Sequence, residues 1–224
     1  MRKLKWKNIS ILLGIVSIIY TIMLKTIDVK PIGPYHTKVG FAAINNFVHT
    51  HLPKNMIWYN ITKYLGYLTF ILIIYYAIIG LKQLIKNKSL KKVDKKIILL
   101  GAFYVLVGIV YVVFEKVIIN YRPVLMGDEL EASFPSSHTM LALCVCASSL
   151  IMSKYYLKDK GIKKILDIIT WVVMIVLVVG RLISGVHWLT DILGGILISG
   201  FLLSILNTCL NIIKEWVSFR YFFY

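Results

Sequence analysis

The sequence predicts an all-α membrane protein built as a bundle of six transmembrane helices. Hydrophobic residues make up 58% of the 224 residues, and the mean hydropathy is +0.77. These residues gather in runs of about 20, the length that crosses the hydrocarbon core of a bilayer. Because a soluble domain has a lower apolar share, we expect a single integral membrane domain over residues 1–224, without room for a separate soluble domain.

Six apolar runs are the expected spans. They cover about 8–25, 57–81, 97–119, 138–153, 164–183 and 190–213. The fourth run is short for a spanning helix, which suggests that its outer end begins at a polar cavity lined by protein. Before the second run, residues 26–56 carry apolar residues between Pro and Gly turn signals, so we expect a helix there at the membrane interface or over a site.

Basic residues are concentrated in the segments on one side of these spans. Residues 1–8 hold four Lys or Arg, 82–96 seven, 154–164 five and the segment after 213 two, which is 18 of the 26 in the chain. Because basic loops stay in the cytoplasm, we expect a multi-pass protein of the cell (plasma) membrane with both termini cytoplasmic. Topology and anionic headgroups explain the net charge of +16 better than nucleic-acid binding does.

Neither a metal site nor a disulfide framework is indicated. The three cysteines lie in apolar runs, where a thiol behaves as a small hydrophobe. Histidines in the first external connection have no Cys or carboxylate partner nearby, and acidic residues in the second are at a spacing typical of solvated loops. We therefore expect no metal and no cofactor. The residues weighed are Cys144, Cys146, Cys209, His36, His49, His51, Asp128, Glu129 and Glu131.

Ionisable residues gather at the outer ends of the later spans. Charged groups near membrane depth are costly and usually mark a function. Singly, each has a structural explanation, such as an arginine that reaches the interface. Because all of these residues are expected on the same side of the membrane, we expect them to form one shared site. The set is Arg122, His138, Arg181, His187 and Asp191.

Two arginines and a helix start suit the binding of phosphate. Arg122 and Arg181 offer permanently charged, fork-shaped donors to phosphate oxygens. Ser136 or Ser137 can serve as the N-cap of the fourth span. The same helix start would present the free N–H groups of residues 136–139 and a positive dipole end to an anion. We expect the Ser136 hydroxyl and nearby amides, helped by Ser137, to complete the phosphate site.

Two histidines and a carboxylate suit phosphoryl transfer. His187 and Asp191 are four residues apart at a helix start, so we expect them to share a face and to hydrogen-bond. The carboxylate would hold one imidazole nitrogen and leave the other free to attack phosphorus. His138 would protonate the leaving oxygen and later deprotonate water. A His–Asp pair alone is often structural. The two arginines and the second histidine expected nearby favour a catalytic role for this one.

These residues resemble the type 2 phosphatidic acid phosphatase superfamily. Its pattern is K-x6-R-P, then P-S-G-H, then S-R-x5-H-x3-D. The resemblance covers about residues 115–191, the motif core, and the spacing of the third block matches throughout. The corresponding residues are Arg122-Pro123, Pro135-Ser136-Ser137-His138, Gly180-Arg181, His187 and Asp191.

Three positions depart from that pattern. Glu115 stands where the family has its lysine, and Lys116 follows one residue later. One residue turns a helical side chain by about 100°, so Lys116 reaches a bound phosphate only if the helix end is irregular. Ser137 replaces a glycine, and Gly180 replaces a serine.

The resemblance implies hydrolysis of a lipid or isoprenoid phosphate through a phosphohistidine, without a metal. For a small six-helix member with an external site and a bacterial-looking composition rich in Lys, Ile and Asn, undecaprenyl pyrophosphate is the first expected substrate. Phosphatidic acid and phosphatidylglycerophosphate follow. The alternatives are a small transporter, in which polar groups would gather near the midplane, and a family member that binds lipid phosphate without catalysis, as the displaced lysine suggests.

Overall fold

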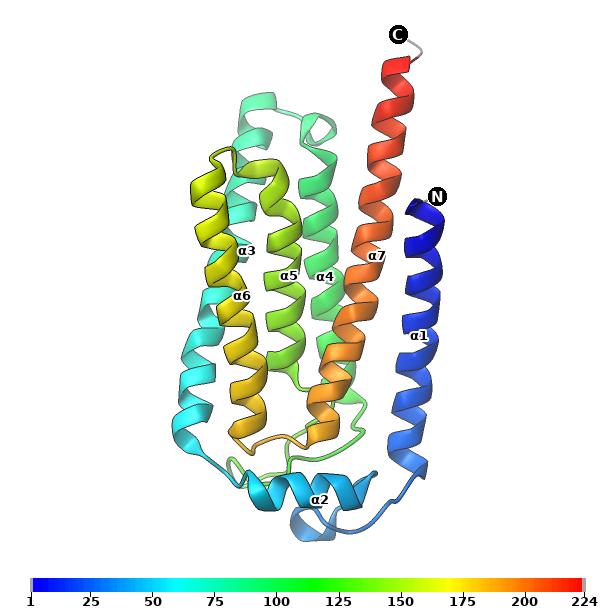
Figure 1. The fold of residues 1–224 in the computed structure, drawn as a ribbon, viewed down its shortest axis with the longest axis vertical. Helices are drawn as coiled ribbons and strands as arrows, with labels where there is room; N and C mark the ends of the chain where they lie inside the picture. Colours follow the sequence, from blue (N-terminus) through cyan, green and yellow to red (C-terminus); the bar gives the residue numbers. More distant parts are fainter. Residues whose placement is uncertain (1, 223–224) are drawn as a thin grey trace.

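Six long helices run side by side, and one short helix lies across an end of the bundle (Figure 1). The structure is a computed structural model that describes the backbone of residues 2–222 and the side chains of residues 5–214. Each long helix contains a stretch long and apolar enough to cross a membrane. The predicted all-α, six-span bundle is therefore confirmed. The long helices are α1 (Arg2–Thr26), α3 (Met56–Asn87), α4 (Lys95–Lys116), α5 (Ser137–Tyr156), α6 (Lys160–Ile183) and α7 (Leu189–Phe222).

Side-chain caps set the first residues of three spans. The Asn55 side chain accepts from the first amides of α3, Asp94 from the Lys96 amide in α4, and Asp159 from the Ile162 amide in α6. Each satisfies an N–H group that the helix itself leaves without a partner. At its other end α3 continues to Asn87, past the expected end at residue 81, because lysine is a good helix former whose long side chain reaches the polar headgroup region.

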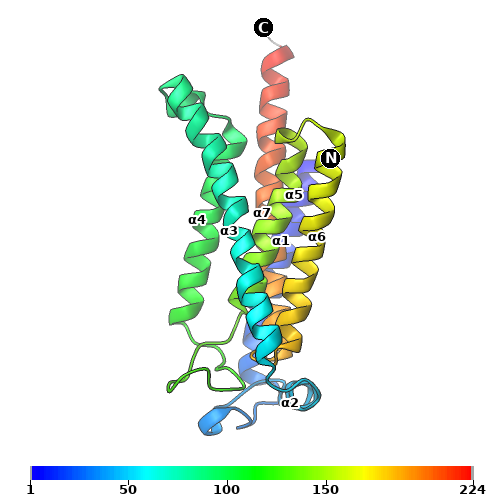
Figure 2. The ribbon, with the colours of Figure 1, turned by 90° about the vertical axis from the view of Figure 1, so that its left-hand side faces the viewer.

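The connections fall into two sets at opposite ends of the bundle (Figures 1 and 2). The longer ones lie at one end and cover residues 27–55, 117–136 and 184–188. The short lysine-rich ones, 88–94 and 157–159, lie at the other end, where α1 begins and α7 finishes. This grouping agrees with the one expected from the basic residues, while the cytoplasmic assignment of the lysine-rich end stays a prediction.

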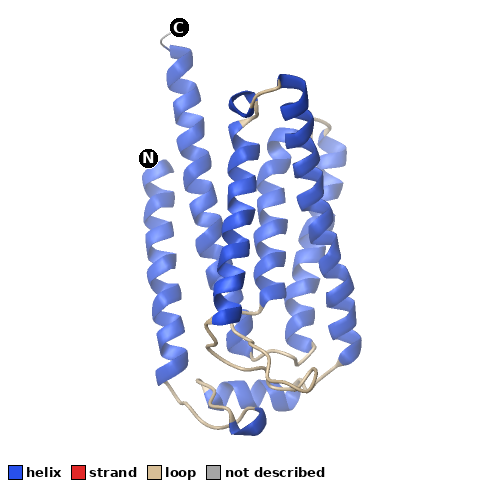
Figure 3. Ribbon diagram, turned by 180° about the vertical axis from the view of Figure 1, so that it is seen from behind, coloured by secondary structure: helices blue, strands red, loops and turns tan. Residues whose placement is uncertain are grey.

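The short helix α2 (Ala42–His51) lies beneath the long connections (Figure 3). Asn45 holds it against the start of α7. The Asn45 amide nitrogen donates to Thr190 Oγ1 at 2.9 Å, and its oxygen accepts from the Thr190 amide at 3.2 Å. A helix was expected in this connection, and the structure has one there, bound to the start of α7.

Helix α5 is the most buried of the spans. In its most apolar stretch 56% of residues are buried, against 11–33% in the others. It packs against α3, α6 and α7, so other helices cover more of it than of any other span. This position explains why its apolar run is short. The first residues of α5 lie at the end of the bundle that holds the long connections.

Candidate active site

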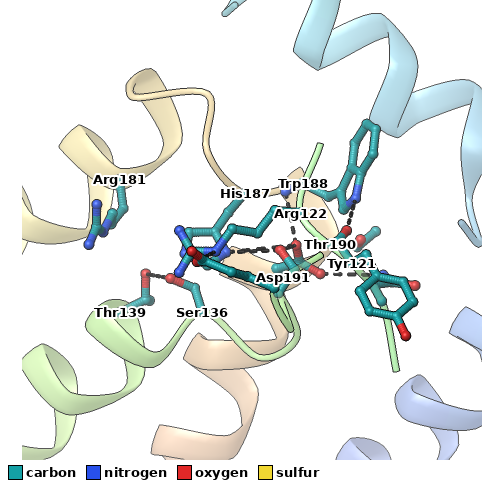
Figure 4. Close-up of polar contacts among 12 residues, drawn as sticks. Tyr121, Arg122, Ser136, Thr139, Arg181, His187, Trp188, Thr190 and Asp191 are labelled. Atoms are coloured by element: carbon teal, nitrogen blue, oxygen red, sulfur yellow. Dashed lines mark hydrogen bonds and ion pairs between the residues drawn. The ribbon is translucent and has the colours of Figure 1, made fainter. Parts of the chain in front are cut away.

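Three helix ends meet at the α2 end of the bundle. There α5 begins, α6 ends, and α7 begins after a connection of five residues. Figure 4 shows side chains from these ends and from residues 117–136 turned toward one another. Five of the residues predicted from the sequence are labelled in this view: Arg122, Ser136, Arg181, His187 and Asp191.

A tight turn holds His187 between α6 and α7. Gly185 has φ +63°, a conformation that L side chains rarely adopt. Its amide donates to the Leu182 carbonyl at 3.2 Å, and a Cβ at Gly185 would come within 2.6 Å of the Leu52 carbonyl oxygen. Glycine thus lets the chain reverse against the α2–α3 connection, and the His187 side chain ends up 1% exposed.

The link between His187 and Asp191 is indirect. His187 Nδ1 lies 3.9 Å from Asp191 Oδ2, so the direct hydrogen bond expected from their spacing is wrong. Instead the Ser133 hydroxyl donates to Asp191 Oδ2 at 2.5 Å, and its oxygen lies 3.0 Å from His187 Nδ1. With the proton on Nδ1, the imidazole donates to Ser133 and keeps a lone pair on Nε2.

The Asp191 carboxylate is fully buried and has several donors around it. Its Oδ2 accepts from the Trp188 amide at 2.9 Å, and its Oδ1 accepts from the Asn120 side chain at 3.3 Å. The Trp188 indole donates in turn to the Tyr121 carbonyl at 2.8 Å. These bonds fix the carboxylate at the start of α7 and tie the connection before α5 to it.

Arg181 is the most unusual group of the site. It is 0% exposed, and its guanidinium lies over the Tyr59 ring, 4.8 Å from the centroid. None of its three nitrogens has a hydrogen-bond partner among the residues that the structure describes. A buried guanidinium is costly unless it is paired, so this one is set to receive an anion.

Arg122 approaches the same place from the connection before α5. Its Nε lies 2.9 Å from Glu131 Oε2, and its side chain is 14% exposed. Its Nη1 is buried and finds no acceptor within the described part of the chain. Glu131 therefore positions this arginine while donors remain for a ligand.

Positive charge surrounds His187. Burial is the main reason that its pKa is well below the ordinary 6.5, and Arg122, Arg181 and His138 lower the pKa further. His187 Nε2 is buried and has no hydrogen-bond partner in the described structure. The imidazole is thus neutral at physiological pH, the form in which a ring nitrogen is a nucleophile.

The start of α5 contributes less than expected in one respect. Ser136 occupies the N-cap position, but its hydroxyl makes no capping bond and accepts from Thr139 Oγ1 at 3.1 Å. Its amide donates to the Asp191 carbonyl at 3.0 Å. The expectation that this amide faces an anion is therefore wrong. The amides of residues 137–139 remain, because a helix leaves its first N–H groups without intrahelical acceptors.

His138 faces a large cavity. The cavity measures about 460 Å³ and lies between α3, α4 and α5, with mostly apolar walls such as Phe70 and Leu141. Ser137 and Lys63 also line it. His138 Nδ1 is buried, and no described residue hydrogen-bonds to it. This imidazole therefore lies between a mostly apolar cavity and the polar site.

Glu115 and Lys116, the last two residues of α4, are both exposed. Glu115 lines a small cavity with Ser133 and His187, of about 10 Å³, room for about one water molecule. The helix end is regular up to Lys116, so the irregularity that would carry Lys116 to a phosphate is lacking, and the position of the family's lysine holds a carboxylate.

Sequence reasoning missed several members of this site. Ser133 and Asn120 carry no local signal, since each is a polar residue in a long connection. Tyr59 lies at the start of the second apolar run, where an aromatic residue is an ordinary interfacial anchor. Lys63 did carry a signal, because it is a charged residue within the second apolar run.

The residues weighed for a metal do not gather into a metal site. Among residues that the structure describes, no group of three or more His, Cys, Asp or Glu side chains is close enough to hold an ion. His49 lies edge-on to Trp188, with ring centroids 5.4 Å apart, and burial lowers its pKa. The expected independence from metal remains a prediction.

Fold and site together define a polytopic membrane protein with a polar site at one end of its helix bundle. The chain belongs to the PAP2 superfamily, because the model of that family matches residues 64–214, more than half of its length. The match includes all three motif blocks and confirms the resemblance drawn from them. It makes the chain a membrane protein of a lipid phosphatase family.

One solved structure supports the fold. It is the crystal structure of the first transmembrane PAP2 type phosphatidylglycerolphosphate phosphatase from Bacillus subtilis, with a TM-score of 0.60 and 20% sequence identity. The similarity covers 91% of this chain and 96% of that one. Among curated protein sequences, none is similar enough to count as a match.

Proposed function

We propose that this protein hydrolyses the phosphate of a membrane lipid phosphate or pyrophosphate, with undecaprenyl pyrophosphate as the first substrate, through a phosphohistidine intermediate. The observation that carries the proposal is the pairing of an unpartnered, buried guanidinium with an unpartnered imidazole nitrogen, those of Arg181 and His187. Membership in the PAP2 superfamily supports the same reaction class.

His187 is the proposed nucleophile. Its Nε2 attacks phosphorus, a nitrogen–phosphorus bond forms, and the bond from phosphorus to the leaving oxygen breaks. The positive charge that develops on the ring is stabilised by Asp191 through the Ser133 hydroxyl, since these groups lie on the Nδ1 side. The low pKa of His187 keeps the nitrogen unprotonated before attack.

His138 is the proposed acid and base. It protonates the oxygen that leaves, and in the second half of the reaction it takes a proton from the water that attacks the phosphohistidine. Its location at the mouth of the large cavity suits this role, because the leaving group carries the lipid and has to depart through an apolar passage.

The phosphate oxygens are bound by Arg122, Arg181 and the start of α5. The two guanidinium groups supply charged donors, and the Ser137 hydroxyl and nearby amides face the developing charge. Ser136 contributes its hydroxyl, which already accepts from Thr139. We assign no phosphate contact to Lys116, whose side chain is exposed at the regular end of α4.

The site is proposed to face the outside of the cell. The lysine-rich connections lie at the opposite end of the bundle, and basic segments are retained in the cytoplasm. A lipid substrate then enters sideways from the outer leaflet through the cavity beside His138.

The alternative is a protein that binds lipid phosphate without turning it over. The observation that favours it is Glu115 at the family's lysine position, where it lines a small cavity together with His187. Phosphatidic acid and phosphatidylglycerophosphate are alternative substrates within the enzyme hypothesis.

The test is phosphate release by the purified full-length chain in detergent and EDTA, from undecaprenyl pyrophosphate, phosphatidic acid and phosphatidylglycerophosphate. Turnover that persists in EDTA supports a metal-independent phosphatase. Turnover that EDTA abolishes would refute metal independence, and a chain that binds these lipids but releases no phosphate from any of them would be the non-catalytic binder.

A further inference from the structure

A lysine lies inside the second membrane span. Lys63 is seven residues into α3, about 10 Å along the helix axis, and the next basic residue of α3 is Lys82. A charge at this depth is costly unless it faces a cavity or a partner. None of the ion pairs between described residues includes Lys63.

The side chain lines the large cavity of about 460 Å³ together with His138. Two neighbours on the same face of α3 contact the site. One turn before Lys63, the Tyr59 ring lies under the Arg181 guanidinium at 4.8 Å. About one turn after it, the helix passes so close to His138 that a Cβ on Gly66 would lie 3.7 Å from the imidazole Cδ2. Lys63 therefore sits between the parts of α3 that touch the arginine and the acid.

The charge of Lys63 acts on His138 along with the charges of Arg181 and Arg122. It is a third cation at the site, but on the side of the leaving group and not of the nucleophile. Glu115, at the family's lysine position, lines the small cavity together with His187. Relative to the family pattern, a lysine is thus missing at the end of α4, and one is present in the cavity that His138 lines.

The chemistry of the leaving group differs between two classes of substrate. When His187 attacks the terminal phosphorus of a lipid diphosphate, the bond to the bridging oxygen breaks and a lipid monophosphate departs with its anionic oxygens. A lipid monophosphate ester instead releases an alcohol, which is neutral once His138 has protonated it. Only the diphosphate puts negative charge beside His138 and into the cavity.

We propose that Lys63 binds the lipid-linked phosphate of a diphosphate substrate, and that it makes this site selective for lipid diphosphates over lipid monophosphates. This rests on the proposed function. The contact strengthens as the bridging oxygen takes up the electron pair of the broken bond, so it acts on the transition state as well as on binding.

The experiment compares two substrates with the same chain, undecaprenyl pyrophosphate and undecaprenyl monophosphate, in the full-length protein in detergent. Lys63→Gln should lower kcat/KM for the diphosphate by about tenfold to a hundredfold, the size of a charged hydrogen bond, and change the monophosphate rate by less than about twofold. Lys63→Arg, which keeps the charge, should retain most of the diphosphate rate.

Lys82→Gln is the matched control, because Lys82 is an exposed lysine of the same helix near its opposite end. An equal loss on both substrates in Lys63→Gln, or no loss on either, would overturn the inference while leaving the phosphatase proposal intact. So would a wild-type protein that releases phosphate from the monophosphate alone. If wild-type protein binds both lipids and releases phosphate from neither, the proposed function itself fails.

Discussion

His187 Nδ1 and the nearest carboxylate oxygen of Asp191 are 3.9 Å apart, and the hydroxyl of Ser133 lies between them. The histidine and the carboxylate that the family pattern pairs by spacing are therefore coupled through a third residue, 54 positions before the histidine. Because His187 Nε2 has no hydrogen-bond partner in the described structure, the ring orientation depends chiefly on this hydroxyl.

Ser133→Ala should lower kcat about tenfold to a hundredfold with little change in KM, because it removes the group that orients the nucleophile and leaves the phosphate donors in place. Steady-state kinetics on the best substrate measures this. The matched control is Ser204→Ala, a buried serine of α7 whose hydroxyl donates to the Phe201 carbonyl, about 20 Å along the helix from Asp191.

A double-mutant cycle separates orientation from general damage. If Ser133 acts through Asp191, the losses in Ser133→Ala and Asp191→Asn are not additive, and the double variant is about as slow as the slower single one. Fully additive losses would mean that the hydroxyl does not connect the carboxylate to His187.

His187→Ala should lower kcat by a factor of at least about 10³, while the protein stays folded. With substrate labelled in its terminal phosphate, wild-type protein should carry a label that is stable in base and labile in acid, as a nitrogen–phosphorus bond is. The variant should carry none. His51→Ala serves as the control, because His51 is an exposed histidine of α2. A label that survives in His187→Ala would exclude His187 as the nucleophile.

Arg181→Met should lose activity and yet raise the unfolding temperature of the phosphate-free protein, by about 2 °C or more. The reason is that the wild-type guanidinium is buried without a hydrogen-bonding partner in the described chain. Inorganic phosphate should raise the unfolding temperature of wild-type protein by mass action and leave that of the variant unchanged. Equal stabilisation of both by phosphate would show that Arg181 binds no anion.

The stability of the protein should fall as the pH is lowered from about 6.5. The pKa of His187 in the folded protein is well below the ordinary 6.5, so below pH 6.5 the unfolded chain binds a proton that the folded chain does not. By linkage, the free energy of unfolding decreases there and is unaffected by this group above pH 6.5. Unfolding temperatures between pH 5 and 8 measure the effect, which should be weaker in His187→Asn. If the unfolding temperature fell equally steeply with pH in both proteins, groups other than His187 would cause the pH dependence.

The number of spans, and the end of the bundle at which the site residues gather, follow from the amino-acid sequence alone. Twenty apolar residues suffice to cross a bilayer and lysines mark the connections of one side, so the order of the runs alone brings the three motif blocks to a common end. Both features depend only on the apolar runs and on the lysines between them, and the structure shows six candidate spans with the motif blocks at one end. The family followed from the same blocks.

The hydrogen bonds that connect the site residues follow from the packing of the helices and not from the motif spacing. The four-residue spacing predicted a shared helix face for His187 and Asp191, but α7 begins at Leu189, so His187 lies in the turn before the helix and out of direct reach. The bridging hydroxyl of Ser133 and the cation of Lys63 come from segments far away in sequence, and no periodicity relates such segments to the motif. Contacts of this kind depend on how the helices pack, which is set by the whole chain and not by any window of it.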